Sequence, residues 1–286
     1  MIFIVIPVFN RWEYTQACLS SLNSQSYTDY KVIVVDHGST DGTSENINNI
    51  FPDVIIITGD NTMWWTAATN LGVRYALDQG ASSILTLNND LVVGEDYLQS
   101  ILNASFVYPN SIIGSVSVNI DNKEHVAFAG IRWNKLIAKY TPTIKNIKSF
   151  SDLQLDYNII ETDLLPGRGT LFPSAVFEEI GFFDDHKFPH YMADEDLSYR
   201  AKKKDYRLLV CVNAIVHSHL SATGINNTNS SLSKFSLLKQ IFLSIKSPNN
   251  LFVRWNWAHN TTFPFLYFLI DSGRVLYSQI RKILKT

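Results

Sequence analysis

Short β-branched runs alternate with helical patterns over the first ninety residues, and this alternation constrains the fold more than any other feature of the chain. We expect four strands, at residues 2–8, 31–36, 54–58 and 83–87. Three segments between them, 13–24, 43–49 and 67–79, place apolar residues at helical spacing. Repeated strand–helix–strand units bury a parallel sheet between two layers of helices. The sequence therefore predicts an α/β fold with a doubly wound, mostly parallel sheet.

Polar residues gather where the expected strands end. Residues 7–11, 36–42, 59–61 and 88–90 follow the four strands in turn. In doubly wound sheets, ligands bind in the crevice beyond the carboxyl ends of the strands. We therefore expect one site built from four segments that lie far apart in the sequence.

The rest of the chain is less regular. Residues 111–165 suggest hairpins and loops, and residues 173–180, 194–204 and 208–212 suggest two helices and a strand. The segment 221–233 is rich in Ser, Thr and Asn, which is typical of a mobile loop or linker. We therefore expect a catalytic domain over residues 1–220, followed over residues 221–286 by a linker and a C-terminal helical extension.

The composition excludes several classes of protein. With 46% hydrophobic and 17% charged residues the chain is globular, and its net charge of -2 gives no general attraction for nucleic acid. Cys18 and Cys211 lack the spacing of a zinc site or a disulfide framework, which suits a reducing compartment. No apolar run approaches the ~20 residues of a membrane span, and the N-terminus lacks the basic segment of a signal peptide. We expect a cytoplasmic protein, at most peripheral at the inner face of the membrane, with a small-molecule substrate.

Asn88, Asn89 and Asp90 follow the apolar strand that ends at Leu87. Hard divalent cations prefer such oxygen ligands, and Mg²⁺ or Mn²⁺ keeps open positions for substrate phosphates. A plain turn is the alternative, and it is the favoured one for the triplet taken alone, because Asn and Asp form local hydrogen bonds in turns.

The glycine-bearing segment 36–42 suits a nucleotide. Asp36 can accept a base N–H, and Gly38 and Ser39 let the backbone approach a ligand. A loop in which Ser39 or Asp41 caps the next helix is compatible with the same residues. The segment lacks the Gly-Lys-Ser/Thr of a Walker loop and the Gly-x-Gly-x-x-Gly of a dinucleotide-binding fold.

Asp194, Glu195 and Asp196 open an expected helix, where the macrodipole stabilises acids, so helix capping is one interpretation. Three consecutive carboxylates exceed what a cap requires, and one of them could act as general base toward an acceptor hydroxyl. His217 and His219 follow the strand at 208–212. One imidazole could reach a metal or pyrophosphate, and a structural role is equally compatible.

Two further segments suit a sugar. Gly167, Arg168 and Gly169 combine a flexible backbone with one guanidinium, although a turn explains them too. Trp65, beside Trp64, could form an apolar wall for a sugar ring or base, and a pair of core aromatic residues is the alternative.

Taken together and in order, these segments resemble the family 2 inverting glycosyltransferases with the GT-A fold, specifically the bacterial rhamnosyltransferase-like branch. The matching segments, within about residues 1–220, are IPVFN (6–10), VDHGSTDG (35–42), GDN (59–61), NLG (70–72), LNND (87–90), GFFD (181–184) and DEDL (194–197) with Arg200. The resemblance implies that Asn10, Asp36 and Asp60 hold the nucleotide.

The resemblance also implies the residues of the reaction centre. Asp90 would end the metal-binding triplet, with Asn88 in place of its first acid, and His217 would match a late histidine near the metal and diphosphate. The base maps to Asp194, with Asp196 as second choice, and Ala193 stands where the family has a glutamate.

The full set of expected site residues is as follows. The nucleotide is expected at Pro7, Phe9, Asn10, Arg11, Asp36, Gly38, Ser39, Asp60, Asn61, Asn70, Asn88 and Asn89. The sugar or acceptor is expected at Trp65, Gly167, Arg168, Gly169 and Glu195. The Mn²⁺ or Mg²⁺ ion is expected at Asp90 and His217, and catalysis at Asp194 and Asp196.

The expected reaction is a metal-assisted single displacement from a nucleoside-diphosphate sugar to a hydroxyl of a saccharide acceptor, in cell-surface polysaccharide assembly. A sugar nucleotidyltransferase is an alternative, but it would carry a glycine-rich loop after the first strand, where this chain has Pro7 and Phe9. A catalytically inactive carbohydrate- or nucleotide-sugar-binding protein of the same fold is another, because Asn88 and Ala193 replace acids.

The C-terminal part contains an apolar segment, 263–270, and a last segment with Arg274, Arg281, Lys282 and Lys285. This pattern resembles an interfacial amphipathic element at a membrane, which would suit a lipid-linked acceptor. Ordinary helix packing or a homodimer contact is at least as compatible with it.

Overall fold

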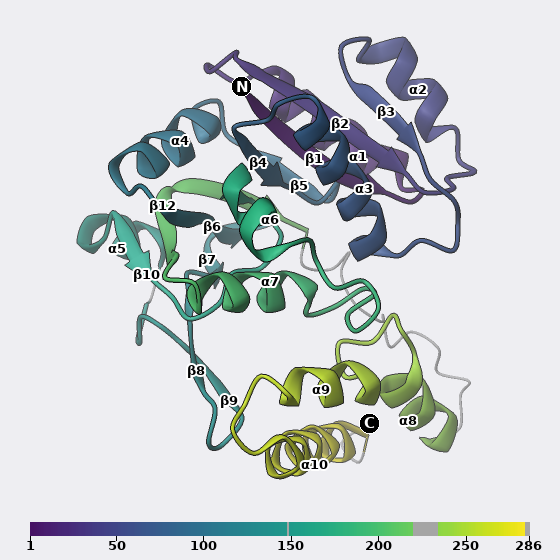
Figure 1. The fold of residues 1–286 in the computed structure, drawn as a ribbon, viewed down its shortest axis with the longest axis vertical. Coiled ribbons are helices and arrows are strands. Elements are labelled where there is room, and N and C mark those ends of the chain that lie inside the picture. Colours follow the sequence, from purple (N-terminus) through teal and green to yellow (C-terminus); the bar gives the residue numbers. More distant parts are fainter. Residues whose placement is uncertain (148, 220–233, 284–286) are drawn as a thin grey trace.

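The computed structural model describes residues 1–147, 149–219 and 234–283 (Figure 1). The main sheet has the strand order β10-β12-β6-β11-β4-β1-β2-β3, with β5 paired to β12 and β7 paired to β6. Its strands are β1 (Ile2–Val8), β2 (Tyr30–Asp36), β3 (Ile55–Thr58), β4 (Ser83–Thr86), β5 (Leu91–Val93), β6 (Ser111–Asn119), β7 (Asn122–Phe128), β10 (Ile159–Glu161), β11 (Thr170–Pro173) and β12 (Arg207–Ser218). A separate hairpin is formed by β8 (Ile131–Asn134) and β9 (Lys139–Pro142).

The described helices lie between and after these strands. They are α1 (Trp12–Asn23), α2 (Thr43–Ile50), α3 (Trp65–Asp78), α4 (Tyr97–Val107), α5 (Phe150–Asp156), α6 (Ser174–Ile180), α7 (Ala193–Lys202), α8 (Lys234–Leu243), α9 (Leu251–Ala258) and α10 (Pro264–Ile283).

The first half of the chain forms the predicted parallel strands. β1 pairs in parallel with β2 and β4, and β2 pairs in parallel with β3. Every residue of β1 is buried, as expected for a central strand covered by helices on both faces.

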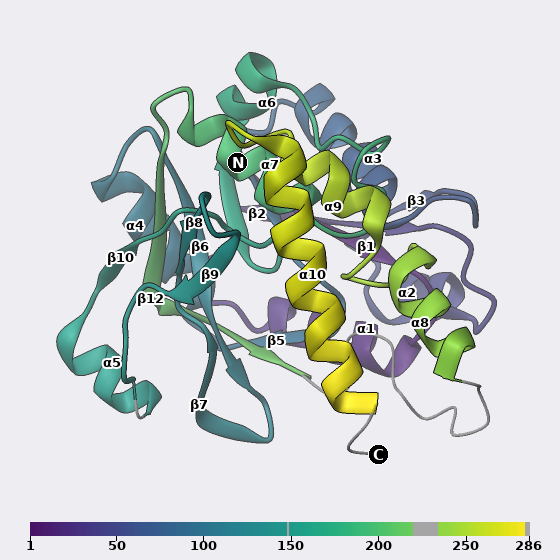
Figure 2. The same ribbon diagram turned by 90° about the horizontal axis from the view of Figure 1, so that it is seen from below.

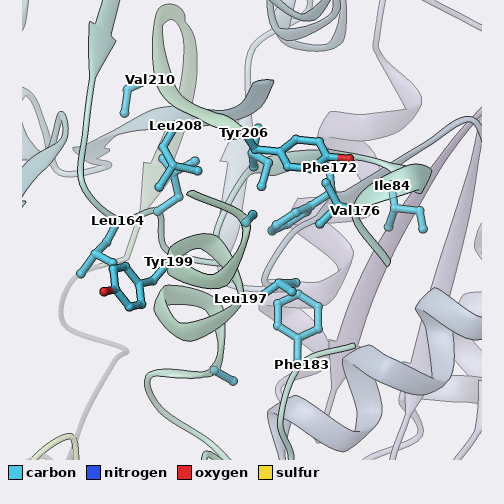
Figure 3. Close-up of a cluster of buried hydrophobic side chains, with 14 of the residues drawn as sticks. Ile84, Leu164, Phe172, Val176, Phe183, Leu197, Tyr199, Tyr206, Leu208 and Val210 are labelled. Carbon is cyan, nitrogen blue, oxygen red and sulfur yellow. The ribbon is translucent and has the colours of Figure 1, made fainter. Parts of the chain in front are cut away.

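Side chains on the two faces of the sheet belong to two separate cores. From β1, Phe3 and Val5 lie in one core, whereas Ile2, Ile4 and Ile6 lie in the other. Residues of α1, α2 and α4 pack in the core of Ile4, and residues of α3, α6 and α7 pack in the core of Val5, part of which is shown in Figure 3. The predicted α/β fold with helices on both faces is confirmed.

The second half of the sheet is mixed, which the sequence did not predict. β6 is parallel to β12, but β11 runs antiparallel to both of its neighbours, β4 and β6. Residues 111–165 contain the predicted hairpins, since β6 pairs antiparallel with β7 and β8 pairs antiparallel with β9. The sequence did not predict that β6 is also a buried strand of the main sheet, parallel to β12. Its residues include the buried Ser111, Ser115 and Ser117, and Ser115 Oγ donates to the Gly169 carbonyl at 2.6 Å.

The antiparallel direction of β11 has a consequence for the site. Thr170, the first residue of β11, pairs with Thr86, the last residue of β4. The glycine-bearing segment 166–169 therefore arrives at the sheet edge where β4 ends, next to Asn88, Asn89 and Asp90.

The C-terminal helices share a core with the rest of the protein. Trp257 of α9 is buried, its ring centroid lies 4.7 Å from that of Trp133, and Trp133 Nε1 donates to Tyr267 of α10 at 3.0 Å. In Figures 1 and 2, α8, α9 and α10 lie together at one end of the molecule, with the β8–β9 hairpin beside α10. No helix among the described residues combines the length and apolar character needed to cross a bilayer. The segment 221–233, expected as a mobile loop, lies outside the described residues, and the domain boundary at 220 stays a prediction.

Candidate functional site

The loops that follow β1 and β2 are hydrogen-bonded to each other. The Asn10 N–H donates to Ser39 Oγ at 2.7 Å, and Asn10 Oδ1 accepts the Thr40 N–H at 2.8 Å. Asp36 is buried and accepts the Ser39 N–H at 2.8 Å. Asn10 and Arg11 have φ values of 58° and 64°, a left-handed conformation that is uncommon outside glycine and concentrates at ligand-binding turns. The two loops therefore form one pre-shaped unit at the sheet edge.

The N-cap residue of α2 is Gly42, which makes no side-chain cap, and Asp41 beside it accepts the Thr43 N–H at 3.2 Å. Asp41 Oδ1 accepts the Thr43 hydroxyl at 2.6 Å at the start of α2, and Asp41 Oδ2 accepts the Trp12 N–H at 3.1 Å at the start of α1. Ser39 does not cap α2, because its hydroxyl accepts from Asn10. Asp41 thus holds the loop in place while Ser39 and Asp36 shape it.

The third loop, after β3, packs against the second. A Cβ atom on Gly38, whose φ is 109°, would lie 3.0 Å from Asn61 Cβ, so glycine permits the close approach. Phe9 is exposed and stacks on His37 at a centroid distance of 5.3 Å, and Asp60 lies in electrostatic reach of the same imidazole. The structure thus brings together the predicted nucleotide residues Pro7, Phe9, Asn10, Arg11, Asp36, Gly38, Ser39, Asp60 and Asn61.

Asp90 lies between β4 and β5 and is 6% exposed. Burial raises the pKa of its carboxyl group, while Arg11, Arg168 and His219 act on it in the opposite direction. Arg11 comes from the loop after β1, Arg168 from the loop before β11, and His219 follows β12. Asp90 is therefore the point where these three segments converge.

Trp65, at the start of α3, contacts both the turn that carries Asp90 and the glycine-bearing segment 166–169. Trp65 Nε1 donates to Asn88 Oδ1 at 2.9 Å, and its ring lies so close to Gly167 that a Cβ atom there would be 2.6 Å from the indole. Asn89 Nδ2 donates to Thr15 Oγ1 at 2.9 Å. Asn88 and Asn89 therefore hold this turn in place through hydrogen bonds within the protein. Asn88 carries no charge, so it does not compensate for the acid that the resemblance implies at this position.

The strand register distinguishes the two histidines. His217 pairs with Val92, and Ser218 pairs with Leu91. Extending this antiparallel register by one residue places His219 opposite Asp90, in agreement with the electrostatic effect of His219 on that carboxyl. Burial lowers the pKa of His217, and the positive charge of Lys123 acts in the same direction. We therefore move the expected metal ligand from His217 to His219.

A divalent cation fits these residues. Among the described residues, no group of three or more His, Cys, Asp or Glu side chains is arranged to hold a metal ion by itself. Mg²⁺ is usually bound through one or two carboxylates together with substrate phosphates and water, so a single carboxylate at the rim of a phosphate site is a suitable anchor. Asp90 would hold such an ion, and the imidazole of His219 adds a nitrogen donor of the kind that Mn²⁺ accepts.

The second acidic cluster lies in the first turn of α7. Asp194 Oδ2 accepts the Gly167 N–H at 2.5 Å, and Asp194 Oδ1 accepts the Glu195 N–H at 3.1 Å. Burial and the neighbouring Asp194 carboxylate raise the pKa of Glu195 well above its usual range. These effects disfavour a negative charge on Glu195, so Asp194, whose carboxylate is held by the Gly167 N–H, is the better candidate base.

The contacts of Asp196 favour a structural role over its predicted role as a second catalytic residue. Its carboxylate is 6% exposed and is engaged on both oxygens, by Arg200 Nε at 2.7 Å and by Asn260 Nδ2 at 3.2 Å. Arg200 in turn donates to the Ile180 carbonyl at 3.0 Å and to the Phe182 carbonyl at 2.8 Å. Asp196 thus anchors α7 to the loop after α6.

Replacing Asp196 with Ala should lower the free energy of unfolding by about 2 kcal/mol, because the partly buried Arg200 loses its compensating charge. Urea denaturation of the purified protein measures this change. The matched control is Asp184→Ala, which breaks a more exposed ion pair with Lys187 and should cost about 1 kcal/mol or less. Equal stability of both variants would contradict the structural role of Asp196.

Two further predicted contacts are also structural. Asn70 is buried, and its side-chain amide exchanges hydrogen bonds with the backbone of Phe183, at 2.8 Å to the carbonyl and 3.1 Å from the N–H. Gly169 has a φ of 76°, and a Cβ atom there would clash with Ser115, Val216 and Tyr97. Asn70 therefore does not reach the nucleotide, and Gly169 packs inside the sheet instead of against a sugar.

Sequence reasoning did not assign His190 to the site. Its imidazole contacts Trp64 at 5.7 Å and Tyr191 at 4.6 Å between ring centroids, and it lies in electrostatic reach of Asp194 and Lys246. Burial is the main cause that lowers the pKa of His190 to about 4, so the ring is neutral at pH 7. The available signal was the aromatic run before the acidic cluster, which carries His190 to the start of α7.

The comparison with known protein families agrees with this arrangement. The model of glycosyl transferase family 2 matches residues 3–162, which is more than half of the chain. The chain belongs to glycosyl transferase family 2. The matched range contains all four loops at the carboxyl edge of the parallel strands, and the fourth of these loops carries Asp90.

Relatives in this family carry glycosyltransferase names. An uncharacterized glycosyltransferase of Haemophilus influenzae is 31% identical over 192 residues, which cover 65% of this chain and 71% of that protein. Glycosyltransferase AglE of Haloferax volcanii is 27% identical over 206 residues, covering 64% and 56%. An uncharacterized glycosyltransferase of Rickettsia typhi is 25% identical over 205 residues, covering 70% and 58%. The chain thus spans less than three fifths of the length of the last two relatives.

Solved structures share the fold. GalNAc-T7 with UDP, GalNAc and Mn²⁺ superposes with a TM-score of 0.62 at 12% identity, covering 96% of this chain and 55% of that one. Staphylococcus aureus TarS with UDP-GlcNAc gives a TM-score of 0.51 at 16% identity, covering 75% and 57%. At these identities the likeness concerns the fold alone, and it confirms the predicted GT-A type.

Proposed function

We propose that this glycosyltransferase moves a sugar from a nucleoside-diphosphate sugar to a hydroxyl of a saccharide acceptor, with inversion at the anomeric carbon, during cell-surface polysaccharide assembly. In this proposal Asp194 is the general base, Arg11 and Arg168 face the diphosphate, and Asp90 with His219 holds Mn²⁺ or Mg²⁺. The donated sugar is a hexose or a deoxyhexose such as rhamnose. The titles of the two solved structures name UDP or a UDP-sugar, and one names Mn²⁺, which supports a nucleotide-sugar donor and a divalent cation.

One observation supports the proposal most directly. Arg168 acts electrostatically on Asp90, at the end of β4, and also on Glu195, in the first turn of α7. The two acidic clusters are about a hundred residues apart in sequence, yet one guanidinium group lies within reach of both. A donor diphosphate at Asp90 and an acceptor hydroxyl at Asp194 would therefore meet around Arg168.

The residues divide the work of a single displacement between them. Asp194 would take the proton of the acceptor hydroxyl as the oxygen attacks the anomeric carbon, and the Gly167 N–H holds its carboxylate in position. Neutral His190 and Glu195, whose charged form is disfavoured by burial, add little charge beside this carboxylate. A bound cation would supply positive charge that stabilises the departing nucleoside diphosphate. Arg11 and Arg168 would orient the same phosphates from two sides of Asp90.

The donor can be identified by thermal stabilisation, since a ligand that binds the folded state raises apparent stability by mass action. We expect one class among UDP-, GDP- and dTDP-sugars to raise the melting temperature in the presence of Mn²⁺ and less so with EDTA. The matching nucleoside monophosphate, which lacks the diphosphate, is the control and should give a smaller shift. If no nucleotide sugar shifts the melting temperature, the proposal is wrong. Binding without turnover of the donor would instead favour an inactive binding protein.

A further inference from the structure

We propose that the outer side of α9 and α10 docks on an anionic lipid bilayer. The surface consists of Phe252, Trp255, Phe265, Leu269, Leu276 and Ile280, and we name it the C-terminal apolar face. This inference rests on the proposed function in one respect: docking would hold the active site beside an acceptor carried by a membrane lipid. Vesicle binding itself requires neither donor nor turnover.

The apolar side chains of α10 that point outward form one stripe. Phe265, Leu269, Leu276 and Ile280 are spaced four, seven and four residues apart, so they lie on one side of a helix, and they are 65%, 50%, 42% and 40% exposed. The opposite side of α10 carries Tyr267 and Asp271, which are buried against the protein. A surface helix ordinarily turns charged residues outward, so an exposed apolar stripe of about 22 Å indicates a binding surface.

The neighbouring helix α9 extends this stripe. Trp255 contacts Phe268 of α10 with ring centroids 5.3 Å apart, and Phe252, three residues earlier on the same side of α9, is exposed. Figure 2 shows α10 across the front of this end of the molecule, with α9 beside it. Aromatic side chains suit the boundary between headgroups and acyl chains, because one end of the ring system can stay near water.

The charge of this region selects an anionic partner. Residues 234–286 contain eight Lys and Arg residues and a single acid, Asp271, although the whole chain has a net charge of -2. Asp271 is buried and paired with Arg254, so it does not offset the exposed positive charge. Arg281 is exposed at the end of the stripe, over the ring of Tyr277. A second copy of the chain would bring the same positive charge to this face, whereas anionic headgroups would neutralise it.

The C-terminal helices are attached to the element that carries the proposed base. Asn260, just after α9, donates to Asp196 at 3.2 Å, and its carbonyl accepts from the Tyr199 hydroxyl at 3.3 Å. Lys246, before α9, lies over the ring of Trp64 at 5.9 Å. These contacts join the C-terminal apolar face to α7 and to the start of α3, so docking would fix the orientation of the active site relative to the bilayer.

Cosedimentation with vesicles tests the proposal on the full chain. We expect binding to vesicles of phosphatidylglycerol and phosphatidylcholine in equal parts, little binding to phosphatidylcholine alone, and release at high salt. The double variant L269E/L276E should bind at least tenfold more weakly, because it places two carboxylates in the stripe. Arg281→Glu should weaken binding about twenty-five-fold, since each basic residue near an anionic surface contributes roughly fivefold and the variant replaces one attraction with a repulsion of similar size.

Two control variants have the same chemical change elsewhere on the surface. Phe106, on α4, is 93% exposed, and Phe106→Glu should bind vesicles like the unchanged protein, as should Lys204→Glu after α7. The donor-dependent thermal shift should be the same in all variants, so a failure of docking is distinguishable from a failure of the proposed function. Equal binding by all variants would overturn the assignment. The assignment would also be overturned if the unchanged protein bound no vesicles and formed a stable dimer in sedimentation velocity, while the L269E/L276E variant was a monomer.

Discussion

Replacing Asp194 with Asn should reduce sugar transfer by at least about a hundredfold and leave donor binding nearly unchanged. The amide keeps the shape of the carboxylate and can still accept the Gly167 N–H, but it cannot take a proton from an acceptor hydroxyl. Steady-state transfer rates, together with the donor-dependent thermal shift, measure the two effects separately. General-base catalysis typically contributes a factor of a hundred to ten thousand, which sets the size of the expected loss.

Glu195→Gln is the matched control for this experiment. Because burial and the neighbouring Asp194 already disfavour the charged form of Glu195, its amide analogue should retain most of the transfer activity. If Glu195→Gln lost as much activity as Asp194→Asn, the two carboxyl groups would share the catalytic role. Unchanged transfer by Asp194→Asn would exclude Asp194 as the base.

Replacing Asp90 with Asn should abolish the Mn²⁺-dependent part of donor binding and, at the same time, stabilise the ligand-free protein. Burial raises the pKa of Asp90 in the folded state, so the ionised carboxylate opposes folding when no cation is present. A neutral amide at this position removes the cost of burying a negative charge. Melting temperatures measured with and without donor and Mn²⁺ should therefore change in opposite directions in this variant.

The same pKa shift predicts a pH dependence. A raised folded-state pKa means that the ligand-free protein gains stability as the pH falls through that pKa, whereas cation-assisted donor binding, which needs the carboxylate, is lost over the same range. Donor titrations at a series of pH values, in Mn²⁺ and in EDTA, separate the two trends. The exposed Asp78→Asn variant is the control and should change neither, and a parallel loss of binding in EDTA would contradict a cation at Asp90.

Local sequence patterns were enough to predict the parallel half of the fold. The first expected strand, 2–8, coincides with β1, because an uninterrupted apolar run that is buried on both faces is recognisable without its neighbours. The polar loops after β1, β2 and β3 follow from where those runs end. Parallel strands present their carboxyl ends at one edge, so the loops proposed to hold the nucleotide could be grouped from the sequence alone. The apolar and basic character of the C-terminal helices was likewise visible in the sequence. The sequence did not indicate which of their side chains stay exposed.

Tertiary structure decided the parts that depend on a partner far away in the chain. The direction of β11 brings Gly167 and Arg168 to Asp90 and Asp194, and no local pattern specifies whether a short strand pairs parallel or antiparallel. Asp194 and Asp196 look equivalent in the sequence, but the helix turns one toward Gly167 and the other toward Arg200. Composition and spacing thus determined the fold class and the edge of the sheet that carries the site, whereas the side-chain roles were decided by packing, since burial and charge partners exist only in the folded chain.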